Sequence, residues 1–123
     1  MLTENLQIYR DAYTLASAIL KNTSNVSKEI RYDSYAELRS LAFSALDIIR
    51  EANVYKEQRY DILQRLVNTI GNILVRVRLF GEERSNGQRY VTVKFQDKIA
   101  HLCEKVEKQA IGWRNSAKRE SVR

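Results

Sequence analysis

The fold class of this chain is set by residues 55–80, YKEQRYDILQRLVNTIGNILVRVRLF. Its apolar residues recur at spacings of one helical turn, which puts them on one face of a helix. This stripe consists of Leu63, Leu66, Val67, Ile70, Leu74 and Val77. Gly81 follows directly and is the predicted C-cap. Gly71, inside the segment, is predicted to allow a close approach of a neighbouring helix.

Two earlier segments show the same periodicity. The first runs from Thr3, its predicted N-cap, to Lys21. Its apolar stripe consists of Leu2, Leu6, Tyr9, Tyr13, Ala16 and Leu20. The second helix is predicted to begin at Ser27 or at Asp33. We expect it to end beside Asn53, in the left-handed conformation that asparagine tolerates.

The last helical segment is predicted to run from about Arg89 to Ser116. A polar connector precedes it and ends in the turn dipeptide Asn86-Gly87. In residues 90–95, YVTVKF, apolar and polar side chains alternate and β-branched residues are frequent, which is also typical of a strand. Because no second strand is apparent for them to pair with, we expect them to start the helix.

Composition agrees with a helical protein. The 123 residues include four glycines and no proline, whereas an all-β domain needs a turn about every 8–12 residues. We therefore predict an all-α, antiparallel up-down-up-down four-helix bundle over residues 1–118, followed by a basic tail at residues 119–123. Apolar residues off the main stripes also predict self-association. They include Ile8, Leu15, Ile19, Leu46, Val75 and Ile111.

Residue types that carry catalysis or bind metals are scarce. His101 and Cys103 are the single histidine and the single cysteine. Two positions apart in a helix they point about 200° apart, so they cannot share a metal or act as a nucleophile pair. We expect a partly exposed His101, a buried Cys103, no enzymatic activity, no metal and no cofactor. The N-terminus lacks a signal-peptide pattern and no apolar run approaches ~18 residues, so a cytoplasmic protein without a membrane partner is expected.

Positive charge is concentrated in the second half of the chain. The net charge is +6, yet residues 1–56 carry seven basic and seven acidic residues, so the whole excess lies in residues 57–123. This asymmetry indicates a polyanionic partner, although a basic surface with no partner stays an alternative. The basic residues of the first half, among them Lys21 and Lys28, are expected to contribute far less to binding.

The predicted nucleic-acid-binding residues fall in three places. Six are expected to cluster where the third helix ends and the fourth begins: Arg76, Arg78, Arg84, Arg89, Lys94 and Lys98. Lys105 and Lys108 lie farther along the fourth helix. Near the opposite end follow Arg114, Lys118 and Arg119. Since few aromatic residues are interspersed, we expect contacts to the phosphate backbone without sequence reading.

Several stretches resemble a family of small four-helix-bundle proteins. They are residues 9–15 (YRDAYTL), 27–32 (SKEIRY), 38–53 (LRSLAFSALDIIREAN) and 112–116 (GWRNS). The chain is similar to proteins encoded in bacterial 23S rRNA intervening sequences and, within that group, to the accessory variability determinants (Avd) of diversity-generating retroelements. It departs from the family pattern at Ser27 and Ile111, where relatives often carry proline and glycine.

The resemblance implies a function as well as a fold. Avd-like proteins are barrel-shaped homopentamers without catalytic activity, which associate with a reverse transcriptase and with template-repeat nucleic acid during mutagenic retrohoming. The expected function is therefore that of an accessory protein binding RNA or DNA and the reverse transcriptase. Two alternatives stay open: an rRNA-intervening-sequence protein of unknown role, and a protein-interaction bundle without a nucleic-acid ligand.

Overall fold

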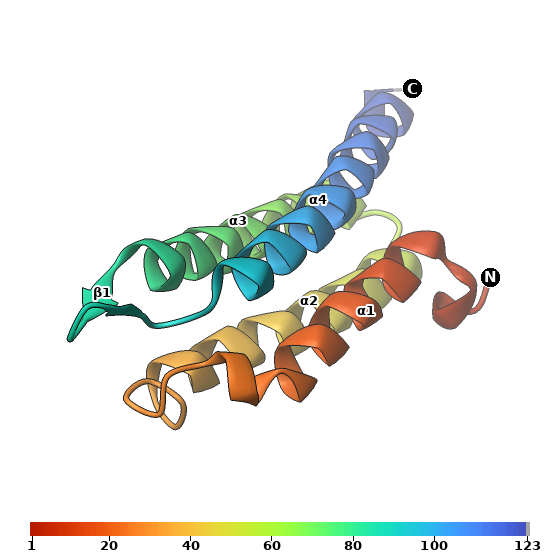
Figure 1. Ribbon diagram of the computed structural model, residues 1–123. Coiled ribbons are helices and arrows are strands. Elements are labelled where there is room, and N and C mark those ends of the chain that lie inside the picture. Colours follow the sequence, from red (N-terminus) through yellow and green to blue (C-terminus); the bar gives the residue numbers. More distant parts are fainter. Residues whose placement is uncertain (123) are drawn as a thin grey trace.

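The computed structural model describes the backbone of residues 1–122 and the side chains of residues 1–118 (Figure 1). Its four helices are α1 (Gln7–Lys21), α2 (Ser34–Val54), α3 (Arg59–Glu82) and α4 (Val93–Val122). Each helix packs against its two neighbours, with α1 and α4 closing the bundle, and successive helices run in opposite directions (Figure 1). The predicted four-helix bundle is confirmed, and α4 continues past its predicted end. No helix within the described residues is long and apolar enough to cross a membrane.

The first helix starts later than predicted and buries a different face. Thr3 lies in a 3-10 turn, and the N-cap of α1 is Leu6, which contributes no capping side chain. Three residues of the predicted stripe are more than half exposed: Leu2, Tyr13 and Leu20. Three residues predicted to lie off it are buried: Ile8, Leu15 and Ile19. The segment has two apolar faces. The buried face carries aliphatic side chains and alanines, whereas the predicted face includes tyrosines, whose hydroxyl groups favour contact with water.

Of the two predicted starts of the second helix, the later one is confirmed. Asp33 is the N-cap of α2, and its carboxylate accepts a hydrogen bond from the Ser34 amide at 2.5 Å. The predicted left-handed end at Asn53 is wrong, because this residue is still helical and the C-cap is Tyr55 with φ −99°. The Asn53 side-chain amide instead donates to the hydroxyl of Thr3 at 3.1 Å, which ties the N-terminal turn to the end of α2.

The two glycines of α3 have roles other than those predicted. Gly81 lies within the helix and is buried, and the C-cap is Glu83 in an extended conformation. A Cβ atom on Gly81 would overlap the side chain of Gln96 in α4. Around Gly71 such an atom would meet nothing within 4 Å. The close approach of two helices is therefore at Gly81, where α3 ends beside the first turns of α4.

A short hairpin joins α3 to the segment before α4. Its strands are β1 (Arg84–Ser85) and β2 (Gln88–Arg89), paired antiparallel. The turn residues Asn86 and Gly87 have φ of 53° and 80°, as a two-residue hairpin turn of type I′ requires. The predicted Asn-Gly turn is confirmed, whereas the strands on either side were not predicted.

Residues 90–92 precede the last helix and do not begin it, contrary to the prediction. Val91 forms an antiparallel bridge with Val26, and the Ser27 amide donates to the carbonyl of Tyr90 at 2.7 Å. The helix then begins at Val93, and the Thr92 hydroxyl accepts a hydrogen bond from its first turn. The pairing partner comes from a loop far away in the sequence, which is why the alternating pattern had no apparent partner.

Tyr35 connects the core to the end of α1. Its side chain is fully buried, and its hydroxyl donates to the carbonyl of Ile19 at 2.5 Å. That carbonyl belongs to the last turn of α1, where the helix itself offers no donor. Burial raises the pKa of Tyr35 above its ordinary value, so the phenol keeps the proton that it donates.

Replacing Tyr35 by phenylalanine should lower the free energy of unfolding by about 1–2 kcal/mol, because the Ile19 carbonyl would remain buried without a donor. Urea unfolding followed by circular dichroism measures the change. Tyr13→Phe is the matched control, since its side chain is exposed and the same substitution there should change stability by less than ~0.5 kcal/mol. Equal stability of the two variants would contradict the capping role.

Candidate nucleic-acid interface

The six basic residues predicted to cluster at one end do not share one face. Arg76 and Arg78 lie two positions apart in α3 and so point about 200° apart. Arg76 points toward α2, where its guanidinium lies 4.0 Å from the carboxylate of Glu37. Arg78 lies on the side of α4, close enough for its charge to act on Cys103. Burial raises the pKa of the Cys103 thiol to about 12, and the nearby Arg78 only partly opposes this.

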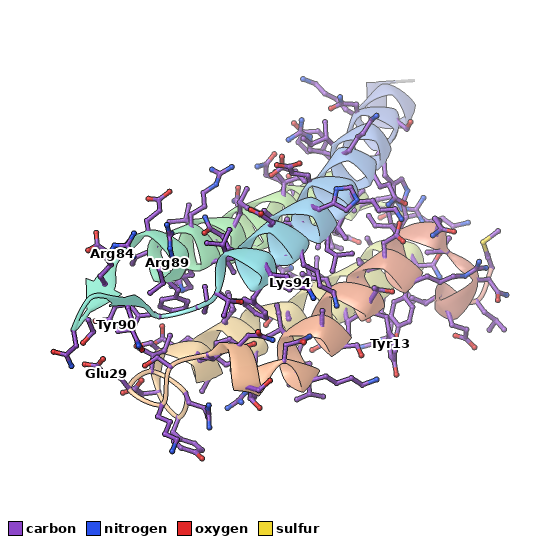
Figure 2. The ribbon with its side chains drawn as sticks, viewed as in Figure 1. Tyr13, Glu29, Arg84, Arg89, Tyr90 and Lys94 are labelled. Carbon is purple, nitrogen blue, oxygen red and sulfur yellow. The ribbon has the colours of Figure 1, made fainter. Side chains whose placement is uncertain are left out.

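The two hairpin arginines differ in what they are free to bind. Arg84 and Arg89 lie opposite each other in β1 and β2 (Figure 2). Arg89 is half-buried, and its guanidinium donates to the carbonyl of Gly81 at the end of α3. It therefore supplies a donor to a helix end that needs one. Arg84 is exposed and has no ion-pair partner within the described residues.

A continuous basic face runs along α4. Its members follow one another at spacings of four and three residues and are all exposed: Lys94, Lys98, His101, Lys105 and Lys108. This spacing places them within one side of the helix, and we name this set the α4 basic face. Lys21 of α1 adjoins it, because Lys21 and Lys98 line the same shallow depression between the two helices. The first half of the chain thus adds a cation beside this face.

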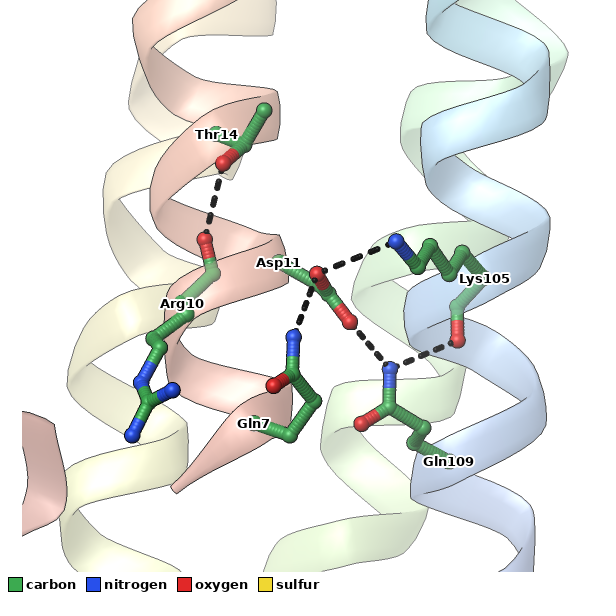
Figure 3. Close-up of polar contacts among 6 residues, drawn as sticks. All are labelled: Gln7, Arg10, Asp11, Thr14, Lys105 and Gln109. Carbon is green, nitrogen blue, oxygen red and sulfur yellow. Dashed lines mark hydrogen bonds and ion pairs between the residues drawn. The ribbon is translucent and has the colours of Figure 1, made fainter. Parts of the chain in front are cut away.

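Asp11 is the one charged side chain that is buried among the described residues, with 6% of its surface exposed. It lies between α1 and α4, where three side chains reach it (Figure 3). Gln7 donates to one carboxylate oxygen at 3.0 Å and Gln109 to the other at 2.7 Å, and the ammonium of Lys105 lies 3.4 Å away. Burial favours the protonated acid, but these hydrogen bonds and the Lys105 charge outweigh it and hold the pKa of Asp11 below its ordinary value of 3.8.

The ionised Asp11 divides the α4 basic face into paired and unpaired cations. Lys105 is held by the carboxylate, so its charge is partly neutralised. Lys94, Lys98 and Lys108 have no ion pair within the described part of the chain. These three, with Lys21 beside them, are the charges available to a ligand on this side.

The basic residues at the far end of α4 contact other side chains of the bundle. Arg114 donates to the side-chain carbonyl of Gln64 in α3 at 2.8 Å. The ammonium of Lys118 lies 6.0 Å from the centre of the Tyr60 ring, within range of a cation–π interaction. The side chain of Arg119 lies outside the described residues. Arg114 and Lys118 thus contribute to the packing of α4 on α3.

His101 and Cys103, the single histidine and the single cysteine, lie in different surroundings. His101 is exposed and Cys103 is buried, as predicted from the sequence. Within residues 1–118 no group of three His, Cys, Asp or Glu side chains could hold a metal ion. Compared with models of protein families and with curated proteins, the chain matches none of them. The resemblance to the intervening-sequence and Avd proteins therefore rests on the quoted stretches alone.

Replacing Asp11 by asparagine should lower the free energy of unfolding by about 1–2 kcal/mol at neutral pH, because the hydrogen bonds to a charged acceptor and the ion pair are lost. The pKa of Asp11 is lower in the folded state than in the unfolded state. The ionised carboxylate therefore contributes to the free energy of unfolding above pH 3.8, and this contribution is lost as the pH falls further. The stabilities of the parent and of Asp11→Asn should therefore converge in acid. Chemical unfolding of both proteins between pH 2 and 7 tests this, and the substitution of the exposed Asp47 by asparagine is the control. If the stabilities of the parent and of Asp11→Asn differ by the same amount at every pH, the proposed role of the ionised Asp11 is wrong.

Proposed function

We propose that this chain is a non-catalytic, cytoplasmic accessory protein of a diversity-generating retroelement. It binds RNA or DNA and the reverse transcriptase and supports mutagenic retrohoming. The observation that carries the nucleic-acid part is the α4 basic face with its three unpaired lysines. The retroelement part rests on the sequence resemblance, and a reverse transcriptase gene with paired repeats beside the gene for this chain would support it.

The α4 basic face suits the backbone of a nucleic acid better than its bases. Its cations are lysines, whose ammonium groups are mobile point charges without the planar fork of arginine. Such contacts fix a phosphate backbone but carry no sequence information. The shallow depression beside Lys98 is also lined by Ser17 of α1, whose hydroxyl can donate to a phosphate oxygen. We therefore expect affinity that depends strongly on salt and weakly on sequence.

The proposed homo-oligomer can use only part of the residues predicted for it, among them the exposed Val75. Ile8, Leu15 and Ile19 are buried within the chain and are not available to a second copy. Two pairs of large apolar side chains are exposed and can serve instead. One pair is Leu20 of α1 with Phe43 of α2, which line one groove, and the other is Val75 with Leu79, one turn apart on α3. The pentameric number follows from the resemblance only.

The same exposed apolar pairs support the alternative function, a protein-interaction bundle without a nucleic-acid ligand. Both functions require protein contacts, so assembly does not discriminate between them. Only the first function requires that the α4 basic face binds nucleic acid, so a binding measurement discriminates between the two.

Light scattering at micromolar concentration should give a mass well above the 14.4 kDa of one chain. Of the two double variants Leu20→Gln/Phe43→Gln and Val75→Gln/Leu79→Gln, one should return the mass toward that of the monomer. Each serves as the control for the other, because both replace a pair of exposed apolar residues and should leave the fold intact. A parent protein that runs as a monomer would rule out the assembly.

Replacing Lys94 and Lys98 by glutamine should weaken binding of unrelated nucleic-acid sequences to a similar extent. The slope of log K against log salt should fall by about 0.7–0.9 for each phosphate that the variant no longer neutralises. Fluorescence anisotropy at several salt concentrations measures both effects. The control is Arg50→Gln/Lys56→Gln, which removes two exposed charges from the other end of the bundle. If the parent binds no nucleic acid, or if both doubles bind like the parent, the protein-interaction function replaces this proposal.

A further inference from the structure

A depression at the hairpin end combines segments that are far apart in the sequence. One wall consists of residues 24–28, from the loop between α1 and α2, and the other of Arg84 and residues 88–92. Three of the lining residues are basic, Lys28, Arg84 and Arg89, and none is acidic. No sequence pattern places Lys28 with the two arginines, because it belongs to the half of the chain without net charge.

Backbone pairing holds the two walls together. Val26 and Val91 form the bridge between them and are both buried. The Ser27 amide donates to the Tyr90 carbonyl at 2.7 Å, and the Thr92 amide donates to the Asn25 carbonyl at 3.2 Å. Because these bonds already exist in the free protein, the basic side chains are brought together before any ligand arrives. Such preorganisation lowers the entropy lost on binding.

The charges in this depression are available to an anion. Lys28 and Arg84 are exposed, and neither has an ion-pair partner within the described residues. Arg89 is oriented by its bond to the Gly81 carbonyl, which leaves other N–H groups of its guanidinium for a ligand. Arginine can bind a phosphate group through two parallel hydrogen bonds.

An aromatic ring and an amide accompany the cations. Tyr90 is half-buried and lines the depression, and Figure 2 shows it at the hairpin end with Arg84 and Arg89. Gln88 also lines it and is exposed. The face of an aromatic ring can stack on any of the nucleobases. A side-chain amide can donate a hydrogen bond to the edge of a base and accept one from it. In a duplex the faces of the bases are covered by their neighbours, so such a contact requires an unpaired base.

We infer that the hairpin depression binds one phosphate group and the adjoining unpaired base of a single-stranded nucleic acid. Lys28, Arg84 and Arg89 contact the phosphate, and Tyr90 stacks on the base. This inference rests on the proposed function and makes it more specific: the α4 basic face binds single and double strands alike, whereas the hairpin depression favours single strands.

The test uses one mixed-sequence oligonucleotide, fluorescently labelled, as a single strand and as a duplex with its complement. The parent should bind the single strand more tightly. Tyr90→Leu should weaken single-strand binding by about tenfold and leave duplex binding unchanged, because it removes one stacking interaction. Tyr90→Phe keeps the ring and should bind like the parent. Lys28→Gln/Arg84→Gln should lower the single-strand salt slope by about 0.7 for each phosphate no longer neutralised, whereas Arg50→Gln/Lys56→Gln should not.

The outcomes separate this inference from the proposed function. If Tyr90→Leu and Lys28→Gln/Arg84→Gln bind single strands like the parent while Lys94→Gln/Lys98→Gln is weakened, the hairpin site is wrong and the α4 basic face stands. If the parent binds neither oligonucleotide, both are wrong. Circular dichroism reports whether Tyr90→Leu folds. Should it not fold, the double variant decides alone, because both of its side chains are exposed.

Discussion

The buried carboxylate of Asp11 fixes how the first and last helices of the bundle meet. A charge removed from water costs several kcal/mol unless it is paired and hydrogen-bonded. Gln7 lies on α1 together with Asp11, whereas Gln109 and Lys105 lie on α4, so these two α4 residues reach the carboxylate together in one register of the two helices only. Sliding α4 by one turn, about 5.4 Å, would bring one of these two residues to the place of the other and leave the carboxylate with one α4 partner fewer. A polar interaction thus sets the register of an interface that apolar side chains alone would specify less strictly.

The position of the basic face follows from this register and from the core. Phe95, Ile99 and Cys103 are buried, and they set the rotation of α4 about its axis. With that rotation, the lysines at the intervening positions lie on the exposed side. The register then brings Lys98 beside Lys21 at the end of α1. The arrangement of charge is therefore a consequence of packing and does not follow from the charge of each half of the sequence.

The sequence predicts the buried face of a helix well where its apolar residues form one clear stripe. The residues of the predicted α3 stripe are buried or half-buried as expected, whereas Val75 and Leu79 are exposed outside it. The first helix has two apolar faces, and only the neighbouring helices determine which one is buried. Gly81 and Asn53 match helix-end patterns, but their surroundings give them other roles: the first admits Gln96 of α4 and the second binds Thr3. Residues 90–92 pair with a segment that no local pattern could identify.

At the candidate site the fold both removes and adds cations, so the sequence predicts only part of it. Within the second half, Arg76, Arg89 and Lys105 contact a carboxylate or a carbonyl of the bundle itself. The fold compensates by bringing Lys21 and Lys28 from the first half to the α4 basic face and to the hairpin depression. These two regions adjoin, since Thr92 lines the depression and α4 begins at the next residue. In the proposed mode of binding, a single strand held at the hairpin would continue along the lysines of α4. The hairpin contact would set its position, and the α4 basic face would add affinity without reading its sequence.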